Sequence, residues 1–185
     1  MNDANTTGKT VATGAFRPRL SYYHPNARGT GCAVQFELHP AHEATSGSIF
    51  ASFARQKSTG SYANGQRQFP SFDWTNRVCV KLDISDLSQI LQVFRGMQES
   101  LADGKGLFHR SERGNTVIKL EHRIDPQPGY FLEVWKKPLE GEAVNAGLLF
   151  TPTEALGLSL AIEQSMDVIA FGIPMVIARE AVDVQ

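Results

Sequence analysis

The apolar residues of this chain change twice from alternating spacing to helical spacing, and this change constrains the fold more than any other feature. Alternation over residues 31–38, 48–55 and 77–84 predicts half-buried strands. From Ile84 the spacing becomes helical, and Ser85 is the expected N-cap of a helix. Because these strands precede the helix without alternating with helices, an antiparallel sheet is expected.

The second half of the chain repeats this plan. Four further strands are expected, at residues 107–109, 116–124, 130–136 and 147–150. Thr151–Glu154 then combines a capping box with a proline at the first helical position, which predicts a second helix ending near Phe171-Gly172. The expected fold class is α+β, with two antiparallel four-stranded β-sheets each followed by a helix (ββββα-ββββα) in a single pseudo-symmetric domain.

The composition is that of a soluble globular protein. Apolar residues make up 42% and charged residues 20% of the chain, which is ordinary for a packed domain. This domain is expected over residues 19–175, between a flexible N-terminal tail (1–18) and a C-terminal tail (176–185). No window approaches 18 consecutive apolar residues, and the N-terminal residues lack the apolar segment of a secretory signal. A cytoplasmic protein without a membrane partner is therefore expected.

Patterns that carry catalysis or metal binding are missing from the sequence. It contains no Gly-x-Ser-x-Gly, no phosphate-binding loop and no dinucleotide fingerprint. Cys32 and Cys79 lie in apolar, strand-like runs and are expected to be reduced, packed thiols. His39 and His42 are spaced i, i+3 but lack a cluster of carboxylate or cysteine partners. We therefore expect no enzyme activity, no cofactor, no metal site and no small-molecule substrate.

The charge is nearly balanced overall but uneven along the chain. The net charge is −1, from 18 basic and 19 acidic residues, which argues against a protein that clamps duplex phosphates. Residues 55–137, however, carry 13 Lys/Arg against 9 Asp/Glu. This asymmetry favours a basic face built from the middle of the chain.

Aromatic and basic side chains are interleaved in two stretches, as the binding of an unpaired strand requires. Stacking of a base on an aromatic ring contributes roughly 1–3 kcal/mol, and scattered cations suffice for the phosphates. The candidate nucleic-acid-binding residues are Phe50, Arg55, Lys57, Arg67, Phe69, Trp74, Arg77, Lys119, Arg123, Phe131, Trp135 and Lys136. From the residues alone, structural roles stay open: Trp74 at a strand entrance, and Lys119 or Arg123 in surface ion pairs.

An ordered set of short motifs resembles the Whirly family over about residues 20–172. The motifs are Phe72-Asp73-Trp74, Phe108-His109, Thr116-Val117-Ile118-Lys119, Gly129-Tyr130-Phe131 and the helix opening Thr151–Glu154. The resemblance implies a four-stranded antiparallel sheet and a helix in each half, and four copies assembled around the helices. It also implies binding of single-stranded DNA with little sequence preference, in grooves at the sheet edges between subunits.

One departure from the family pattern concerns the first strand. Plant members carry a Lys-Gly-Lys-Ala-Ala-Leu motif there, whereas the corresponding stretch of this chain is Arg28-Gly29-Thr30-Gly31-Cys32-Ala33-Val34. The second lysine is replaced by Thr30 or Gly31, so assemblies that depend on this lysine are not implied for this chain.

The sequence thus predicts a sequence-tolerant single-stranded DNA-binding protein acting in DNA repair, recombination or transcription regulation. A homo-oligomer, expected to be a tetramer, follows from the resemblance and from Leu156, Leu160 and Ala161, which lie off the main apolar stripe of the second helix. Two alternatives stay open. One is RNA binding by the same surface, as in the related kinetoplastid guide-RNA-binding proteins. The other is an oligomeric interaction module without nucleic-acid binding, which the near-neutral charge favours.

Overall fold

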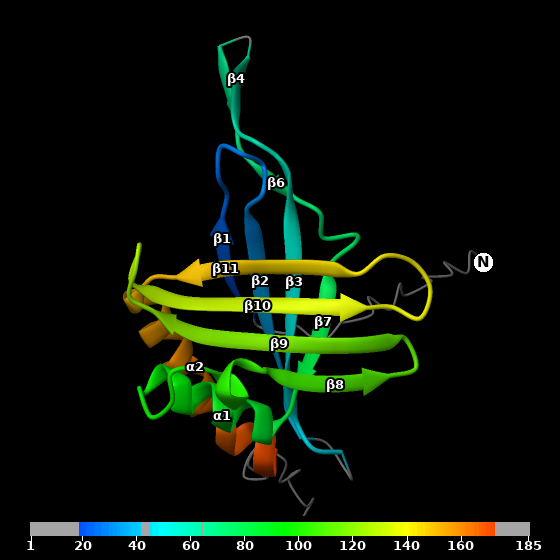
Figure 1. Ribbon diagram of the computed structural model, residues 1–185, viewed down its shortest axis with the longest axis vertical. Coiled ribbons are helices and arrows are strands. Elements are labelled where there is room, and N and C mark those ends of the chain that lie inside the picture. The colour runs from blue at the N-terminus through cyan, green and yellow to red at the C-terminus, as the bar shows by residue number, and fades with distance from the viewer. Residues whose placement is uncertain (1–18, 42–44, 64, 173–185) are drawn as a thin grey trace, which may run out of the picture.

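Two antiparallel β-sheets cross each other, and two helices pack against them and share their hydrophobic core (Figure 1). The computed structural model describes residues 19–41, 45–63 and 65–172. Strands precede a helix in each half, so the predicted α+β class and the repeated strands-then-helix plan are confirmed. The predicted tails 1–18 and 176–185 lie outside the described residues.

The first sheet is built around the long strand β3. Its strands are β1 (Arg19–His24), β2 (Cys32–His39), β3 (Ser48–Ser58), β6 (Ser71–Phe72) and β7 (Val78–Leu82). The order is β1-β2-β3, and β6 and β7 pair in turn with the remaining edge of β3. Strand β7 alternates strictly between buried and exposed residues.

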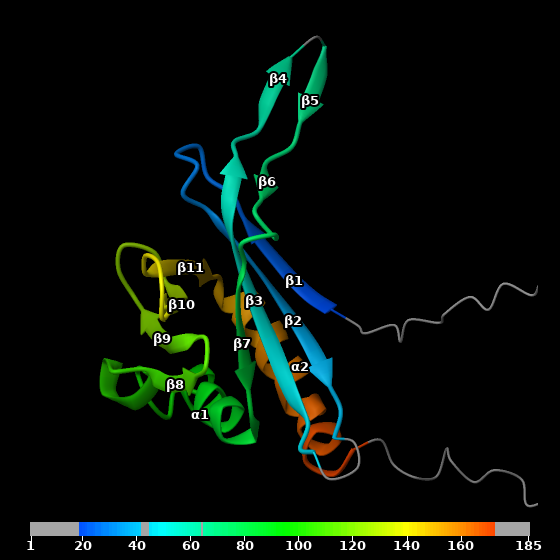
Figure 2. The same ribbon diagram turned by 90° about the vertical axis from the view of Figure 1, so that its right-hand side faces the viewer.

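The first half has more strands than the four predicted. Strands β4 (Ser61–Ala63) and β5 (Gln66–Gln68) form a hairpin that projects away from the body of the molecule (Figure 2). The predicted edge strand at 68–72 is split, because Pro70 lies between β5 and β6 and has no backbone N–H to donate to a ladder. The hairpin therefore forms a separate two-stranded sheet beyond the end of the first sheet.

The second sheet matches the predicted four strands. They are β8 (Leu107–Ser111), β9 (Gly114–Arg123), β10 (Gly129–Lys137) and β11 (Val144–Phe150), in the order β11-β10-β9-β8. The short 3-10 helix η1 (Leu101–Gly104) precedes it. Strand β11 is an edge strand and crosses the first sheet near β2 and β3.

The two helices begin at acidic capping boxes. Helix α2 (Pro152–Phe171) has Thr151 as its N-cap and Glu154 as the reciprocal partner, so the predicted start and end are confirmed. Helix α1 (Ile84–Phe94) begins at Asp83, whose carboxylate accepts from the backbone of Ser85 and Asp86. Ser85 as N-cap is therefore wrong, since the chain leaves β7 at Leu82 and turns into the helix at once.

The core lies between the two sheets and the two helices. Its largest fully buried side chains include Phe53 from the first sheet, Phe150 from the second and Ile162 from α2. The opposite side of α2 stays open, because Leu156 and Leu160 are 60% and 52% exposed. No helix among the described residues is long and apolar enough to cross a membrane.

Candidate nucleic-acid interface

A groove of about 860 Å³ separates the upper end of the first sheet from β10 and β11 of the second. We call it the inter-sheet groove. Its polar and aromatic lining residues include Thr30, Arg55, Lys57, Asp73, Asn76, Phe131, Glu133 and Asn145. Because both halves of the chain contribute, the groove is a product of the crossing of the two sheets.

One wall of the groove is fixed by the buried side chain of Gln56. Its amide oxygen accepts from the backbone N–H of Asn26 and Gly31, at 2.9 and 3.0 Å, and its amide nitrogen donates to the carbonyls of Asn26 and Ser58. A Cβ at Gly31 would lie 2.3 Å from the carbonyl oxygen of His24. Glycine is therefore required here, and a lysine at position 31 would disrupt the wall.

Two of the predicted cations line this groove. Arg55 lies opposite Cys32 in the β2–β3 register, so its side chain is on the core-facing side of the sheet, yet it is exposed at the open end. Lys57 lies two residues further along β3. Hydrogen bonds from Asn76, together with the nearby Lys57 ammonium, hold the pKa of Asp73 below its usual value. The groove thus combines two cations with an acid on its rim whose ionised form is stabilised.

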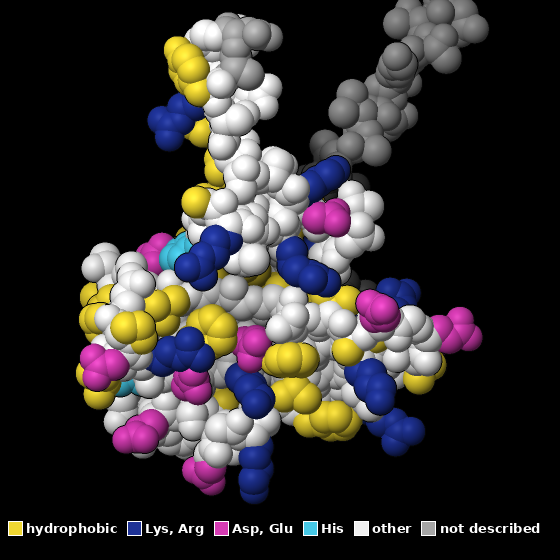
Figure 3. All heavy atoms as spheres, turned by 45° about the horizontal axis from the view of Figure 1, so that its top comes forward, with side chains coloured by type: hydrophobic (Ala, Val, Ile, Leu, Met, Phe, Trp, Pro, Cys, Tyr) yellow, Lys and Arg dark blue, Asp and Glu magenta, His cyan; other side chains and the backbone are white. Residues whose placement is uncertain are grey.

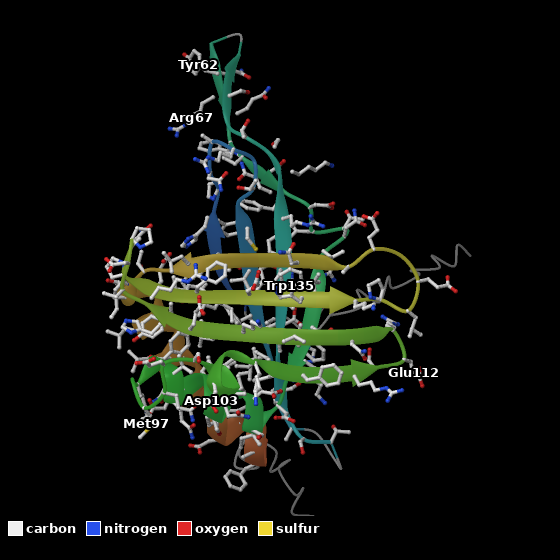
Figure 4. The ribbon with its side chains drawn as sticks, in the orientation of Figure 1. Tyr62, Arg67, Met97, Asp103, Glu112 and Trp135 are labelled. Carbon is white, nitrogen blue, oxygen red and sulfur yellow. The ribbon has the colours of Figure 1, made fainter. Side chains whose placement is uncertain are left out.

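The second sheet presents an accessible aromatic face toward solvent, which we call the second outer face. Alternation in β8, β9 and β10 places Phe108, Val117 and Trp135 in one row across three strands. Phe108 is 61% and Trp135 44% exposed, and Figure 4 shows Trp135 on β10 at the centre of this sheet. The predicted residues Lys119, Arg123 and Phe131 lie on the same face. Phe131 also lines the inter-sheet groove, which makes the two surfaces continuous.

Arg123 is held in place on this face by two neighbours. Its guanidinium carbon lies 3.8 Å from the centroid of the Phe131 ring, and it forms an ion pair with Glu121. The surface ion pair left open by the sequence is thus present. A stacked guanidinium still offers its outer plane to a base, since Arg planes serve as stacking surfaces for unpaired bases.

Three other predicted residues lie on the opposite side of the first sheet, which we call the first outer face. Phe50, Trp74 and Arg77 line a separate cavity of about 490 Å³ there, together with residues that include Arg19, Glu37 and His39. Alternation along β3 separates Phe50 from Arg55, so the structure does not bring this group together with the inter-sheet groove.

The remaining three predicted residues stand apart from both surfaces. Arg67 and Phe69 belong to the projecting hairpin and its exit, where the guanidinium lies 5.3 Å from the Phe69 centroid. Phe69 and Tyr62 are 73% and 76% exposed. Lys136 is half-buried and points to the side of β10 opposite Trp135, because successive strand residues face opposite ways.

Sequence reasoning overlooked several residues that the structure adds to this interface, among them Phe108, Glu133, Asn145 and Gly147. Phe108 could have been found, because it alternates with buried Leu107. Asn145 and Gly147 carry no such signal, since their positions opposite Trp135 and Glu133 depend on the β10–β11 register.

The described residues hold no cluster suited to a metal ion, and the two cysteines differ in exposure. No group of three or more His, Cys, Asp or Glu side chains in this part of the chain could hold a metal ion, and His42 of the His39–His42 pair lies outside it. Burial raises the pKa of Cys32 to about 12, so this thiol stays protonated and packed as predicted. Cys79 is exposed instead, because the alternation of β7 turns it to the first outer face.

The surface charge near the interface is mixed. Figure 3 shows Lys and Arg side chains interspersed with hydrophobic and acidic ones, without merging into one basic patch. Such a surface agrees with the net charge of −1 and suits contacts to separate phosphates better than the dense phosphate array of a duplex.

Two crossed antiparallel sheets, each followed by a helix, define a Whirly-like fold, and the chain has this fold. It is similar to WHY1 from Arabidopsis thaliana, with a TM-score of 0.64, 18% identity and coverage of 84% of this chain and 86% of that one. It is also similar to WHY3 from the same plant, with a TM-score of 0.64, 17% identity and coverage of 83% of this chain and 89% of that one. A third similar structure is that of the plant transcriptional regulator PBF-2, with a TM-score of 0.64, 19% identity and coverage of 85% of this chain and 84% of that one. No protein-family model and no curated protein matches the sequence. The predicted resemblance is therefore confirmed at the level of the fold.

Proposed function

We propose that this protein binds single-stranded DNA with little sequence preference, through the inter-sheet groove and the second outer face. The observation that carries this proposal is the continuity of the two surfaces through Phe131, which joins the cations Arg55 and Lys57 to the exposed ring of Trp135. Unpaired bases have two free π-faces for such rings, whereas a duplex hides them in its stack. The protein acts by binding alone, without catalysis.

The energetics favour bases over phosphates as the main source of affinity. Each base stacked on a ring contributes roughly 1–3 kcal/mol. The exposed cations around the same surface are few: Arg55, Lys57 and Lys119. Each phosphate contact on a single strand steepens the slope of log affinity against log salt by only about 0.7. Binding is therefore expected to weaken modestly with salt.

The proposal extends to a homo-oligomer, expected to be a tetramer, formed through the exposed side of α2. Leu156 and Leu160 are one helical turn apart and exposed, and a row of apolar residues on an open helix face suits burial against a second copy. Replacing Leu160 by Glu should convert the oligomer to smaller species in light scattering. An unchanged mass would place the interface elsewhere.

The biological setting follows from the chemistry of the ligand. Protection or presentation of an exposed strand serves repair, recombination and transcription regulation alike. The similarity to PBF-2, described as a plant transcriptional regulator, supports the last of these. RNA offers the same stacking faces and phosphates, so competition between DNA and RNA oligomers of one sequence measures the preference for the sugar.

A fluorescence-anisotropy titration tests the proposal. An unstructured single-stranded DNA of mixed sequence should bind at least about tenfold more tightly than the matching duplex, because only the single strand exposes its bases. A preference for the duplex, or no binding to either, would sink the proposal and leave an interaction module without nucleic-acid binding.

A further inference from the structure

Glu133 lies in an unexpected place for an acid. Glu133 is half-buried on β10 and lies on the second outer face, between Phe131 and Trp135. It also lines the inter-sheet groove. A carboxylate at the centre of a surface proposed to bind a polyanion opposes phosphate binding, so its presence calls for a different contact.

The carboxylate of Glu133 keeps its capacity to accept hydrogen bonds. Lys119 lies directly opposite on β9 and Gly147 on β11. Throughout the described ranges of the chain, no side chain or backbone group forms a hydrogen bond or ion pair with the carboxylate of Glu133, whose backbone pairs within the sheet. Glu121, on the same face, differs because it pairs with Arg123.

Gly147 keeps the approach to Glu133 open from β11. A Cβ at this position would lie 3.0 Å from Cζ of Phe131 and 3.2 Å from Cβ of Glu133. A side chain there would crowd the ring and cover the acid. The absence of one leaves the ring and the carboxylate side by side at the groove.

The group that fits this arrangement is the edge of a base. Residues two apart on a strand are roughly 7 Å apart, so a base stacked on Trp135 brings its edge within reach of Glu133. An ionised carboxylate only accepts hydrogen bonds. The exocyclic amino group of cytosine donates to it, whereas thymine presents a carbonyl oxygen at the same position.

We propose that Glu133 gives the groove a preference for bases with an exocyclic amino group, cytosine above all, over thymine. The inference rests on the proposed function and adds a bias to otherwise sequence-tolerant binding. Asn145 lines the groove next to this position and, with an amide that both donates and accepts, tolerates either base. Glu133 therefore carries the discrimination.

The test compares oligo-deoxycytidine, oligo-deoxythymidine and oligo-deoxyuridine of one length, at slightly alkaline pH where cytosine is unprotonated. The wild-type protein should bind oligo-deoxycytidine about fivefold more tightly than the other two, as one base contact supports. Oligo-deoxyuridine removes the thymine methyl group as a cause. In Glu133→Gln the ratio should fall to about one, because an amide pairs with either edge.

A charge-matched control separates base recognition from electrostatics. Asp103 is exposed in η1, and Figure 4 shows it apart from Trp135, so Asp103→Asn removes one negative charge away from the groove. This variant should keep the fivefold ratio. If Glu133→Gln tightens all three oligomers equally, or if the wild type shows no preference, the inference is wrong while the proposed function stands. If none of the oligomers binds, the proposed function itself fails, and the inference with it.

Discussion

The two outer faces carry the same kinds of residue but differ in how far those residues are already engaged with one another. On the first outer face, His39 contacts Phe50 at 4.4 Å between centroids, and Tyr23 contacts both Phe72 and Trp74. Arg19 is paired with Glu37. On the second outer face, Phe108 and Trp135 make no ring contact with any residue in the described part of the chain.

This difference teaches that residue type alone does not identify a binding surface. Rings that already contact other rings gain little from a base, because stacking would replace existing contacts. Exposed rings gain the full contact. The aromatic and charged residues of the first outer face are therefore best explained as structural, because they contact one another. The second outer face and the inter-sheet groove form the proposed binding surface, because their rings are exposed.

The largest expected effect is the loss of a free ring. Trp135→Ala should weaken single-stranded DNA binding by about 2 kcal/mol, or roughly thirtyfold, because one stacked base loses its platform. Trp74→Ala, on the first outer face, should cost at most about twofold by the same reasoning. Anisotropy titrations of both variants measure the difference. Equal losses would abolish the distinction between the two faces, and a larger loss for Trp74 would reverse it.

The second effect concerns how the two halves are joined. His24 Nε2 and Glu154 Oε1 are 2.9 Å apart, which links β1 of the first half to the first turn of α2. The other carboxylate oxygen accepts from the backbone N–H and hydroxyl of Thr151. Burial opposes ionisation of Glu154, but the hydrogen bonds from Thr151 and the contact with His24 outweigh it, so its pKa lies below its ordinary value of 4.5.

Glu154→Ala should therefore lower the free energy of unfolding by about 1 kcal/mol, because the reciprocal hydrogen bonds of the capping box and the contact with His24 are lost. Because the folded pKa is depressed, the unfolded chain binds more protons, and this stabilisation is present above pH 4.5 and lost as the pH falls through the folded value. Urea titrations at several pH values should show a shallower acid decline in the variant. Glu163→Ala, which removes the exposed Arg95–Glu163 pair, should cost no more than about 0.5 kcal/mol. Equal costs would show that the link between halves adds nothing beyond a surface ion pair.

The elements of the fold could be predicted wherever the signal is local. Thr151, Pro152 and Glu154 define the start of α2 by contacts within one turn, so the sequence places it correctly. The start of α1 is harder to predict, because Asp83, Ser85 and Asp86 are all suitable N-cap residues. The end of β7 at Leu82 decides that Asp83 is the N-cap. Pro70 predicts an interruption of the strand at this position, but whether the strand bends or breaks depends on its pairing with β3.

The interface could be predicted only in part, because its assembly is long-range. Alternation alone places Phe131 and Trp135 on one side of β10 and Lys136 on the other, so charge without alternation is a misleading signal at Lys136. The meeting of Arg55 with Phe131 depends on the crossing of two sheets, which no local pattern encodes. The contacts that engage Phe50 and Trp74 are likewise invisible without the structure.

The smallest expected effect separates the two faces by charge. Arg55 lines the inter-sheet groove, and neither a hydrogen bond nor an ion pair of its side chain occurs among the described residues. Arg77 of the first outer face donates to the carbonyl of Trp74 at 2.9 Å. Arg55→Gln should weaken binding about threefold at low salt and reduce the slope of log affinity against log salt by about 0.7, the value for one phosphate contact on a single strand.

Arg77→Gln should leave the salt slope unchanged, because its guanidinium is engaged by the protein and lies on the other side of the sheet. Titrations at four salt concentrations with one oligonucleotide measure both slopes. The slope is more informative than the affinity, since a variant that merely loosened the fold would weaken binding without releasing fewer counterions. If Arg77 changes the slope and Arg55 does not, the phosphates follow the first outer face, and the aromatic row of the second would need a different ligand.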